Sequence, residues 1–411
     1  MIFVQIVYVA CTLSTPLYWI AYRNNNSRRS ERYLKNEKKP RETLDPGFHY
    51  VKDHFDANDL TVSLFTTVFA LSAIASRLFS AKALEKGKRN TILFTGLILI
   101  ILATFGYLWS GTLALLLTMR VLFGIGFGMG NTTLPTMAFG VIPIRRLGEG
   151  LGCLGLSTSI ALSLGPVIGS ILLDQSGFPT LVYVTLGITL LILPLIYPLS
   201  KKVKAPVVAT NDLTTPKQPG FNKSLLLPSL LNMLMSITYG GLLSFLILFG
   251  KEVHLANASL FFLFNVVSLI IIRPISGTLY DRKGHRVLLI PAALFLIAGL
   301  LLLSYSTSTG FLALAALCYG VGFGTAQPTL QTWMIQSVSP QQQGMANSMY
   351  FNSLDFGVAV GALLLGQIAS HSNYATMYRY SSIFLVLFIL IYAIYMINRY
   401  KTNGESKQNL G

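Results

Sequence analysis

The sequence predicts an all-α membrane protein with twelve transmembrane helices in two six-helix repeats, of which the first helix is atypical or disrupted. Three observations support this fold class. Of the 411 residues, 53% are hydrophobic and 11% are charged, whereas soluble domains carry about 25% charged residues. Apolar runs of about 20 residues, long enough to cross a hydrocarbon core of about 30 Å, recur along the chain. Motifs of the first half also recur in the second half at one fixed spacing.

The apolar runs place the expected transmembrane helices. They occupy residues 1–22, 60–80, 91–109, 113–141, 148–172, 178–199, 223–250, 257–280, 287–306, 309–337, 343–370 and 375–398. A polar, Pro-rich segment follows the sixth run and divides the chain into two halves. We therefore expect five regions: an atypical N-terminal segment (1–49), an N-terminal helical bundle (50–199), a cytoplasmic linker (200–222), a C-terminal helical bundle (223–398) and a cytoplasmic tail (399–411).

The net charge of +16 comes mostly from short loops between the apolar runs, so a nucleic-acid partner is not expected. Clusters such as Arg145-Arg146 and Lys201-Lys202 follow every second run, and the intervening loops are nearly uncharged. Because cytoplasmic loops are enriched in Lys and Arg, both termini are predicted to be cytoplasmic in a multi-pass protein of the plasma or inner membrane. The three cysteines lie in apolar runs, so neither a disulfide framework nor a metal site is expected.

The two halves of the chain repeat each other at a spacing of 196 residues. The segment "GIGFGMGNTTLPT" (124–136) matches "GVGFGTAQPTLQT" (320–332) at seven of thirteen positions. The same spacing pairs Arg77 with Arg273, Glu85 with Asp281 and Gly148 with Gly344, among others. Two related six-helix halves are typical of transporters that bind their ligand near the bilayer midplane, so the repeat itself indicates transport.

The repeat also identifies an anomaly at the start of the chain. Residues 223–250 form an apolar run, and their counterpart, 27–54, is polar. The stretch from Arg23 to Glu42 contains eight basic and three acidic residues, which a bilayer core does not accept. The apolar run 1–22 could serve as the first span, but the basic stretch would then lie outside the cell. Residues 1–49 are therefore either a genuine first span or a replaced or frame-shifted start.

The end of the eighth run carries a candidate conformational latch, "GTLYDRKGHR" (277–286). Gly277 allows close helix approach, and Asp281 can accept hydrogen bonds at the N-terminus of a neighbouring helix. Arg282 and Arg286 could pair with carboxylates across the bundle, although a solvated turn is the alternative interpretation. The segment resembles the loop signature of the major facilitator superfamily. The resemblance implies a latch that includes Gly277, Asp281, Arg282, Gly284 and Arg286, with Glu85 and Lys86 in a degenerate first-half copy.

The fourth run, 113–141, contains a charge deep in apolar sequence. Arg120 precedes Gly124, Gly126, Gly128 and Gly130, which provide small residues for close helix packing. A charge at this depth is costly and usually faces the bundle interior, although an arginine that snorkels to the interface is the alternative. The run resembles the fourth-helix signature of the same superfamily, which implies that Arg120 takes part in proton coupling.

The fifth run, 148–172, resembles the signature of the drug–proton antiporter branch of this superfamily. The matching residues are Gly152, Gly165, Pro166 and Gly169. A Gly-Pro pair inside a span bends the helix and releases backbone groups. A packing kink with no bearing on the direction of transport is the alternative.

The eleventh run, 343–370, carries Asp355 near its middle. A carboxylate at the midplane is a functional residue by default, so a proton-coupling role is expected. A neutral carboxyl that is hydrogen-bonded to Asn352 or to a neighbouring helix is the alternative. Further polar or aromatic residues in the runs are candidates for a cavity wall, each with packing as its alternative role: Asn131, Tyr239, Gln327, Gln331 and Trp333.

The resemblance to the superfamily covers about residues 50–398. It implies a secondary active transporter that works by alternating access, with protons, a small-molecule substrate and the lipid bilayer as its partners. The fifth run favours proton-coupled efflux of a small amphiphilic molecule. A proton-coupled uptake symporter and a transport-inactive receptor or scaffold are the alternatives. An enzyme and a cofactor are not expected, because no nucleophile–base set, metal cluster or phosphate-binding loop accompanies the apolar runs.

The unusual start of the chain gives a prediction at the level of DNA. If residues 1–49 replace an ancestral first helix, another reading frame upstream of the codon for Tyr50 should encode an apolar run of about 20 residues. Sequencing this region in all three frames provides the measurement. The absence of such a run, together with cysteine labelling that places Arg28–Arg41 outside the cell in an active protein, would establish 1–22 as the first span.

Overall fold

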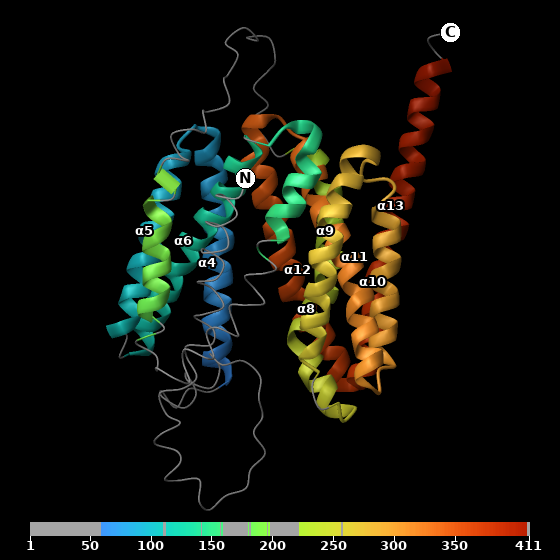
Figure 1. Ribbon diagram of the computed structural model, residues 1–411, viewed down its shortest axis with the longest axis horizontal. Coiled ribbons are helices and arrows are strands. Elements are labelled where there is room, and N and C mark those ends of the chain that lie inside the picture. Colours follow the sequence, from blue (N-terminus) through green and yellow to red (C-terminus); the bar gives the residue numbers. More distant parts are fainter. Residues whose placement is uncertain are drawn as a thin grey trace, which may run out of the picture. The chain divides into compact units, whose positions relative to one another are not determined.

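The computed structural model describes residues 59–109, 112–140, 142–156, 158, 180, 182–194, 196–197, 222–255 and 258–408. Within these residues the regular structure is helical and contains no β-strand (Figure 1). The expected N-terminal segment 1–49, and with it the question of the first span, lies outside the described residues. The same is true of Gly165, Pro166 and Gly169 of the antiporter-like signature.

The described helices follow the expected order along the chain. The α-helices are α4 (Asp59–Glu85), α5 (Arg89–Gly106), α6 (Leu113–Phe139), α8 (Leu226–Glu252), α9 (Leu260–Lys283), α10 (Leu289–Ser304), α11 (Thr309–Gln336), α12 (Gln343–His371) and α13 (Tyr374–Gln408). Short 3-10 turns are η1 (Tyr107–Trp109), η2 (Ile144–Arg146), η3 (Lys223–Leu225) and η4 (Pro340–Gln342). Two shorter apolar helical segments cover Leu147–Leu156 and Val182–Pro194.

Seven of the helical stretches in this part of the chain are long and apolar enough to cross a membrane. Most helix ends lie within a few residues of the ends of the apolar runs. The main difference is α13, which continues to Gln408 and so includes most of the expected tail 399–411. Polar residues sustain a helix outside the bilayer, and no proline follows Tyr374 to end it.

The chain forms two compact units, and each includes a short segment from the other half of the sequence. Among the described helices, unit 1 contains α4, α5, α6, the segment Val182–Pro194, the end of Leu147–Leu156 from Cys153 onward, and the beginning of α12, within Ser339–Ser348. Unit 2 contains α8 to α11, α13, α12 from Met349 onward, and the segment Arg145–Gly152. Both of these segments, Arg145–Gly152 and Ser339–Ser348, include the first turns of a helix.

In unit 1, α6 packs against α4 on one side and α5 on the other because its glycines alternate between the two faces. Residues two apart on a helix point in nearly opposite directions, and residues four apart share a face. A Cβ on Gly128 would lie 2.6 Å from the backbone oxygen of Ala73 in α4, and one on Gly126 would lie 2.6 Å from that of Gly96 in α5. A side chain at either position would therefore push two helices apart.

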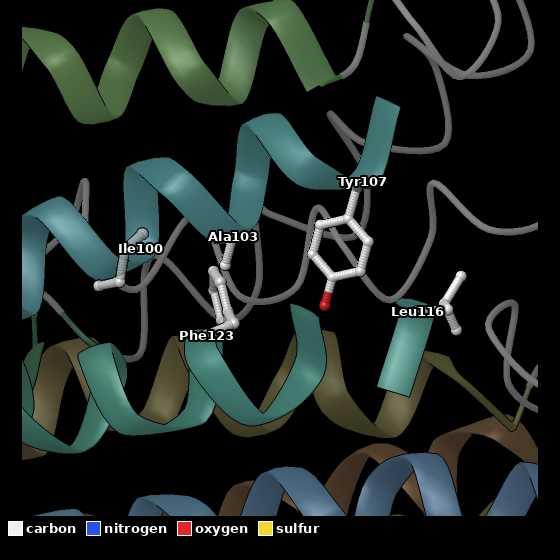
Figure 2. Packing of buried hydrophobic residues seen from close by; sticks show 5 residues of the cluster. All are labelled: Ile100, Ala103, Tyr107, Leu116 and Phe123. Atoms are coloured by element: carbon white, nitrogen blue, oxygen red, sulfur yellow. The ribbon is translucent and has the colours of Figure 1, made fainter. Parts of the chain in front are cut away.

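A cluster of buried hydrophobic residues lies between α5 and α6, toward the start of α6. Figure 2 shows Ile100, Ala103 and Tyr107 on the α5 side and Leu116 and Phe123 on α6. Each of these side chains is at most 4% exposed. The cluster lies toward the end at which α6 begins, where the Thr112 hydroxyl accepts a hydrogen bond from the Leu115 N–H (3.4 Å) and caps the helix.

Unit 2 repeats these contacts at positions 196 residues later. A Cβ on Gly322 of α11 would lie 2.6 Å from the Ala292 backbone oxygen of α10, which is the equivalent of the Gly126–Gly96 contact. A Cβ on Gly320 would lie 2.6 Å from the Cβ of Ser268 in α9. The capping residue recurs as well, since the Ser308 hydroxyl accepts from the Phe311 N–H. Residues at equivalent positions therefore bring three helices together in the same way in each unit.

The alternating glycines give a prediction for stability. We expect Gly126→Ala to lower the melting temperature of the purified protein, because overpacking a tight contact costs about 1–3 kcal/mol. Gly130→Ala is the matched control in the same helix, because a Cβ at this position meets no atom within 4 Å. Thermal unfolding of both variants in detergent is the measurement. Equal melting temperatures for the two would contradict the packing argument.

Candidate functional site

The end of α9 binds the start of another helix through a carboxylate. The two Asp281 oxygens accept hydrogen bonds from the backbone N–H groups of Gly148 (2.7 Å) and Glu149 (2.9 Å). These amides open the helical segment Leu147–Leu156, and helix N-termini carry partial positive charge that favours a carboxylate. The geometry is the one expected for Asp281 in a latch, and both partners belong to unit 2.

Glycines make this contact possible. A Cβ on Gly277 would lie 2.5 Å from the backbone oxygen of Gly148, and one on Gly148 would lie 2.7 Å from that of Gly277. Gly152, the one described member of the antiporter-like signature, comes equally close, because its Cβ would lie 2.7 Å from the Arg273 backbone oxygen. Asp281 can therefore reach the two amides only because both helices lack side chains at the crossing.

The remaining latch residues have different surroundings. Gly284 ends α9 with φ +70°, a left-handed conformation that favours glycine, and its N–H donates to the Tyr280 carbonyl (2.7 Å). Arg282 and Arg286 are exposed, and neither is hydrogen-bonded to a carboxylate within the described residues. The expected pairing of these arginines across the bundle remains a prediction.

His285, between these arginines, is held as a neutral ring. It stacks on Trp333 with ring centroids 4.2 Å apart, and its Nδ1 shares a 2.8 Å hydrogen bond with the Tyr392 hydroxyl. Burial lowers the pKa of His285 to about 4, and the positive charges of Arg286 and Arg399 contribute further. Trp333, expected at a cavity wall, has one ring face covered by His285 and is 7% exposed. This position favours packing for Trp333.

Glu85 and Lys86, the first-half counterparts of Asp281 and Arg282, make no equivalent contact within the described residues. Glu85 and Lys86 are exposed, and within the described residues Glu85 accepts no hydrogen bond. The helix start that lies opposite is that of α12, where a Cβ on Gly344 would lie 3.1 Å from Leu84 Cδ1. The carboxylate of Glu85 therefore does not cap α12 as Asp281 caps Leu147–Leu156.

Arg120 lies inside unit 1, as its position in an apolar run indicated. It is 3% exposed, and its guanidinium stands 4.7 Å above the ring of Phe69 in α4. Figure 2 shows the buried Tyr107 ring extending from the α5 side toward α6. The burial of Arg120 against α4 argues against an arginine that snorkels to the interface.

A second buried arginine, which sequence reasoning left out of the site, connects two of the predicted cavity residues. Arg273 is 3% exposed, and its Nη2 donates a hydrogen bond to the Gln327 side chain. Its charge also acts on the Tyr239 hydroxyl, and the Tyr239 ring stacks on Phe323 at 4.6 Å. Tyr239, Arg273 and Phe323 lie near the middle of α8, α9 and α11. The sequence did contain a signal for Arg273, because the repeat places an arginine, Arg77, at the equivalent position of the first half. Arg77 is also buried, at 1% exposed.

The remaining predicted residues have surroundings of their own. Gln331 is 7% exposed, and Asn131 contributes its backbone oxygen to a hydrogen bond from the Asn347 side chain (3.3 Å). Asp355 is half-buried in the part of α12 that belongs to unit 2, whereas Arg120 belongs to unit 1. Their joint role in proton coupling remains a prediction. Within the described residues, no three His, Cys, Asp or Glu side chains come together as metal ligands.

Comparison with known proteins agrees with this architecture. The Major Facilitator Superfamily sequence model matches residues 41–362. The multidrug resistance protein MdtG of Escherichia coli O9:H4 is 24% identical over 372 residues, which cover 85% of this chain and 86% of that protein. An uncharacterized MFS-type transporter of Methanocaldococcus jannaschii is 23% identical over 346 residues, with 80% and 88% of the two chains covered.

Solved structures share the fold. The human organic anion transporter MFSD10 (TETRAN) superposes with a TM-score of 0.72 at 16% identity, covering 95% of this chain and 98% of its own. The transporter FucP in the outward conformation gives a TM-score of 0.70 at 15% identity, with 95% and 97% covered. Because the family model covers most of the sequence, the chain belongs to the major facilitator superfamily and is a multi-pass membrane transporter, not an enzyme.

Proposed function

We propose that the protein exports small amphiphilic molecules across the cell membrane in exchange for protons, by alternating access. The observation that carries this proposal is the contact of Asp281 with Gly148 and Glu149. It joins the end of α9 to the start of the helical segment Leu147–Leu156, which carries Gly152 of the antiporter-like signature. A contact between two helix ends that can form and break is what a transporter with two states requires.

The direction of transport rests on the antiporter-like signature and on similarity. MdtG, whose name describes multidrug resistance, aligns with most of this chain. The solved fucose:proton symporter FucP shares only the fold, at 15% identity. Efflux is therefore the preferred direction, with proton-coupled uptake as the alternative. The sign of the proton movement that accompanies transport separates the two, and a receptor or scaffold would show no movement.

The helices support two six-helix repeats and twelve spans in total. The glycine contacts of α6 recur in α11 at a spacing of 196 residues, down to equivalent neighbouring atoms. The described helical segments correspond to the second to twelfth expected spans. In this arrangement both termini would be cytoplasmic, because the basic loops would lie on the cytoplasmic side of the cell membrane.

The cluster around Arg273 is the best candidate for substrate contact. Intramembrane ionisable residues mark substrate or ion pathways, and Arg273 lies near the middle of α9. Tyr239 and Phe323 supply aromatic faces beside Arg273 and Gln327. Sites lined by aromatic groups with a few polar groups suit molecules that have both apolar and polar parts. An amphiphilic substrate meets this description.

Proton coupling is assigned to Arg120 and Asp355. A carboxylate inside a span marks a substrate or ion pathway. A proton and a polar or cationic substrate could then compete for Asp355, which is the simplest physical route to antiport. The two residues need not touch for this role.

Transport driven by a pH gradient tests the coupling residues. In proteoliposomes we expect gradient-driven flux to fall about ten-fold or more in Asp355→Asn and in Arg120→Gln, while substrate exchange continues. A change of this size is typical of the coupling between two binding sites. The reason is that exchange needs both conformations but no net proton transfer. Full gradient-driven flux in Asp355→Asn would reduce that residue to a structural carboxyl, and the absence of substrate flux in the wild type would favour a scaffold.

The latch gives a second functional prediction. Asp281→Asn replaces a charge-assisted acceptor with a neutral one, which weakens such a bond by about 1.5 kcal/mol, or about ten-fold in an equilibrium between two states. We expect the transport rate to fall while substrate affinity changes little. Rates and dissociation constants measured on the same preparations provide the comparison.

Glu85→Gln is the matched control for this variant. It removes the same charge from the equivalent position in α4, where no described group binds it. The transport rate of Glu85→Gln should stay within about two-fold of the wild-type rate, because exposed charges contribute little free energy. Equal loss of binding and transport in Asp281→Asn, or an equally large effect of Glu85→Gln, would argue against a latch at Asp281.

A further inference from the structure

The loop after α9 is fastened to the ends of α11 and α13 in unit 2. In the last turn of α9, the Tyr280 hydroxyl donates a hydrogen bond to the side-chain oxygen of Gln336 at the end of α11 (3.0 Å). In the loop itself, His285 stacks on Trp333 of α11 and shares its Nδ1 hydrogen bond with the Tyr392 hydroxyl of α13. The ends of three helices therefore meet at this loop.

One face of α13 brings a second arginine to the same place. Tyr392, Tyr395 and Arg399 are spaced by three and four residues, so they share a face of the helix. This face packs on α11, because the ring centroid of Trp333 lies 6.1 Å from that of Tyr392 and 5.7 Å from that of Tyr395. The Arg399 Nη1 donates a hydrogen bond to the Tyr395 hydroxyl (3.2 Å). Arg399 therefore lies on the face of α13 that contacts the loop after α9.

Arg286 and Arg399 form an arginine pair beside His285. Arg286 follows His285 in the chain, and the charges of both arginines act on the His285 ring. Both arginine side chains are exposed, and neither forms an ion pair with a carboxylate of the described residues. The carboxylate of Asp281, the closest along the chain to Arg286, is bound by two backbone amides. The arginine pair therefore attracts an anion, because two like charges close together are stabilised by an opposite charge between them.

The arginine pair lies at the depth of lipid headgroups. Arg399 is the last residue of the membrane span of α13, and Arg286 comes three residues after the span of α9. Exposed apolar side chains accompany both, because Val287 directly follows Arg286 and Ile397 precedes Arg399 by two residues. Positive charge next to exposed apolar surface suits an anion that carries acyl chains better than it suits a free phosphate. Basic pockets between transmembrane helices bind anionic headgroups in this way.

We propose that the arginine pair, Arg286 and Arg399, binds the phosphate of an anionic phospholipid, with Tyr395 as the residue that positions Arg399. Guanidinium groups bind phosphate oxygens through paired N–H donors, and the single bond of Arg399 to Tyr395 leaves most of its donors available. The bound phosphate neutralises both charges and links the loop after α9 to the end of α13. The partner of Arg286 is then a lipid and not a carboxylate across the bundle. This lipid site lies outside the residues assigned to substrate contact and proton coupling.

Titration with short-chain lipids tests the site. The purified protein in a neutral detergent is titrated with dioctanoyl phosphatidylglycerol or with dioctanoyl phosphatidylcholine. Dissociation constants come from the rise in melting temperature, because a ligand that binds the folded state stabilises it. We expect phosphatidylglycerol to bind about ten-fold more tightly, since its headgroup carries a net negative charge and a charge-assisted hydrogen bond contributes about this factor. Equal affinities for the two lipids would overturn the proposal.

A soluble headgroup separates a lipid from a free phosphate. Glycerol 3-phosphate carries the same phosphate without acyl chains, so it makes the same contacts with the guanidiniums and none with the apolar side chains. We expect it not to displace phosphatidylglycerol at equal concentration. Displacement at equal concentration would identify a site for a free phosphate and would overturn the assignment to a lipid.

Charge variants separate this site from general attraction to a basic surface. We expect Arg286→Gln and Arg399→Gln each to weaken phosphatidylglycerol binding about ten-fold. Arg399→Lys keeps the charge but loses the planar fork of donors, so it should weaken binding about three-fold. Lys283→Gln is the matched control, because Lys283 is an exposed basic residue at the end of α9 whose charge is not among those that act on His285. A loss in Lys283→Gln equal to that in Arg399→Gln would show that only the total surface charge matters, and the proposal would fail.

The positioning role of Tyr395 has its own test. Tyr395→Phe removes the hydroxyl that accepts from Arg399 and should weaken phosphatidylglycerol binding about three-fold, while phosphatidylcholine binding stays the same. Tyr380→Phe is the control, because Tyr380 is an exposed tyrosine of α13 whose hydroxyl makes no hydrogen bond within the described residues. An equal effect of the two variants would overturn the role of Tyr395. These measurements need neither a substrate nor a proton gradient, so they decide on the lipid site whatever the transport assays give.

Discussion

Close contact between glycine-rich helix faces is the constraint on which the rest of this structure depends. Lipid tails are as apolar as leucine, so helices in a bilayer do not associate through the hydrophobic effect and rely on packing at short range. In α6 and α11 alternate glycines give each helix two smooth faces, and both neighbours approach to backbone contact. The same principle brings Gly277 to Gly148, and this crossing is what allows one carboxylate to reach two amides.

Much of this fold could be predicted from the sequence because membrane helices leave strong signals. Apolar runs gave the helices and their order, and the spacing of 196 residues related α6 to α11. Thr112 and Ser308 mark the starts of these two helices with capping hydroxyls. The end of α13 was missed because hydropathy reports where a helix leaves the bilayer and not where the helix stops.

The site was harder to predict because side-chain partners depend on which helices face each other. Asp281 was identified with its type of partner, since a carboxylate beside glycines suits a helix N-terminus. Arg273 was noticed only as a repeat position, because its link to Gln327 and Tyr239 requires α8, α9 and α11 to meet. Trp333 was predicted at a cavity wall, and nothing in the sequence indicated that His285 stacks on its ring. Spacing along one helix cannot supply this information.

The length of α13 has a consequence for how the protein is positioned in its membrane. Its 35 residues extend about 52 Å at 1.5 Å per residue, well beyond a hydrocarbon core of about 30 Å. The overhang carries Arg399 and Lys401 directly after the apolar stretch. Basic residues at the end of a span attract anionic lipid headgroups. The length of α13 and the basic residues at its end together favour one depth of this helix in a bilayer.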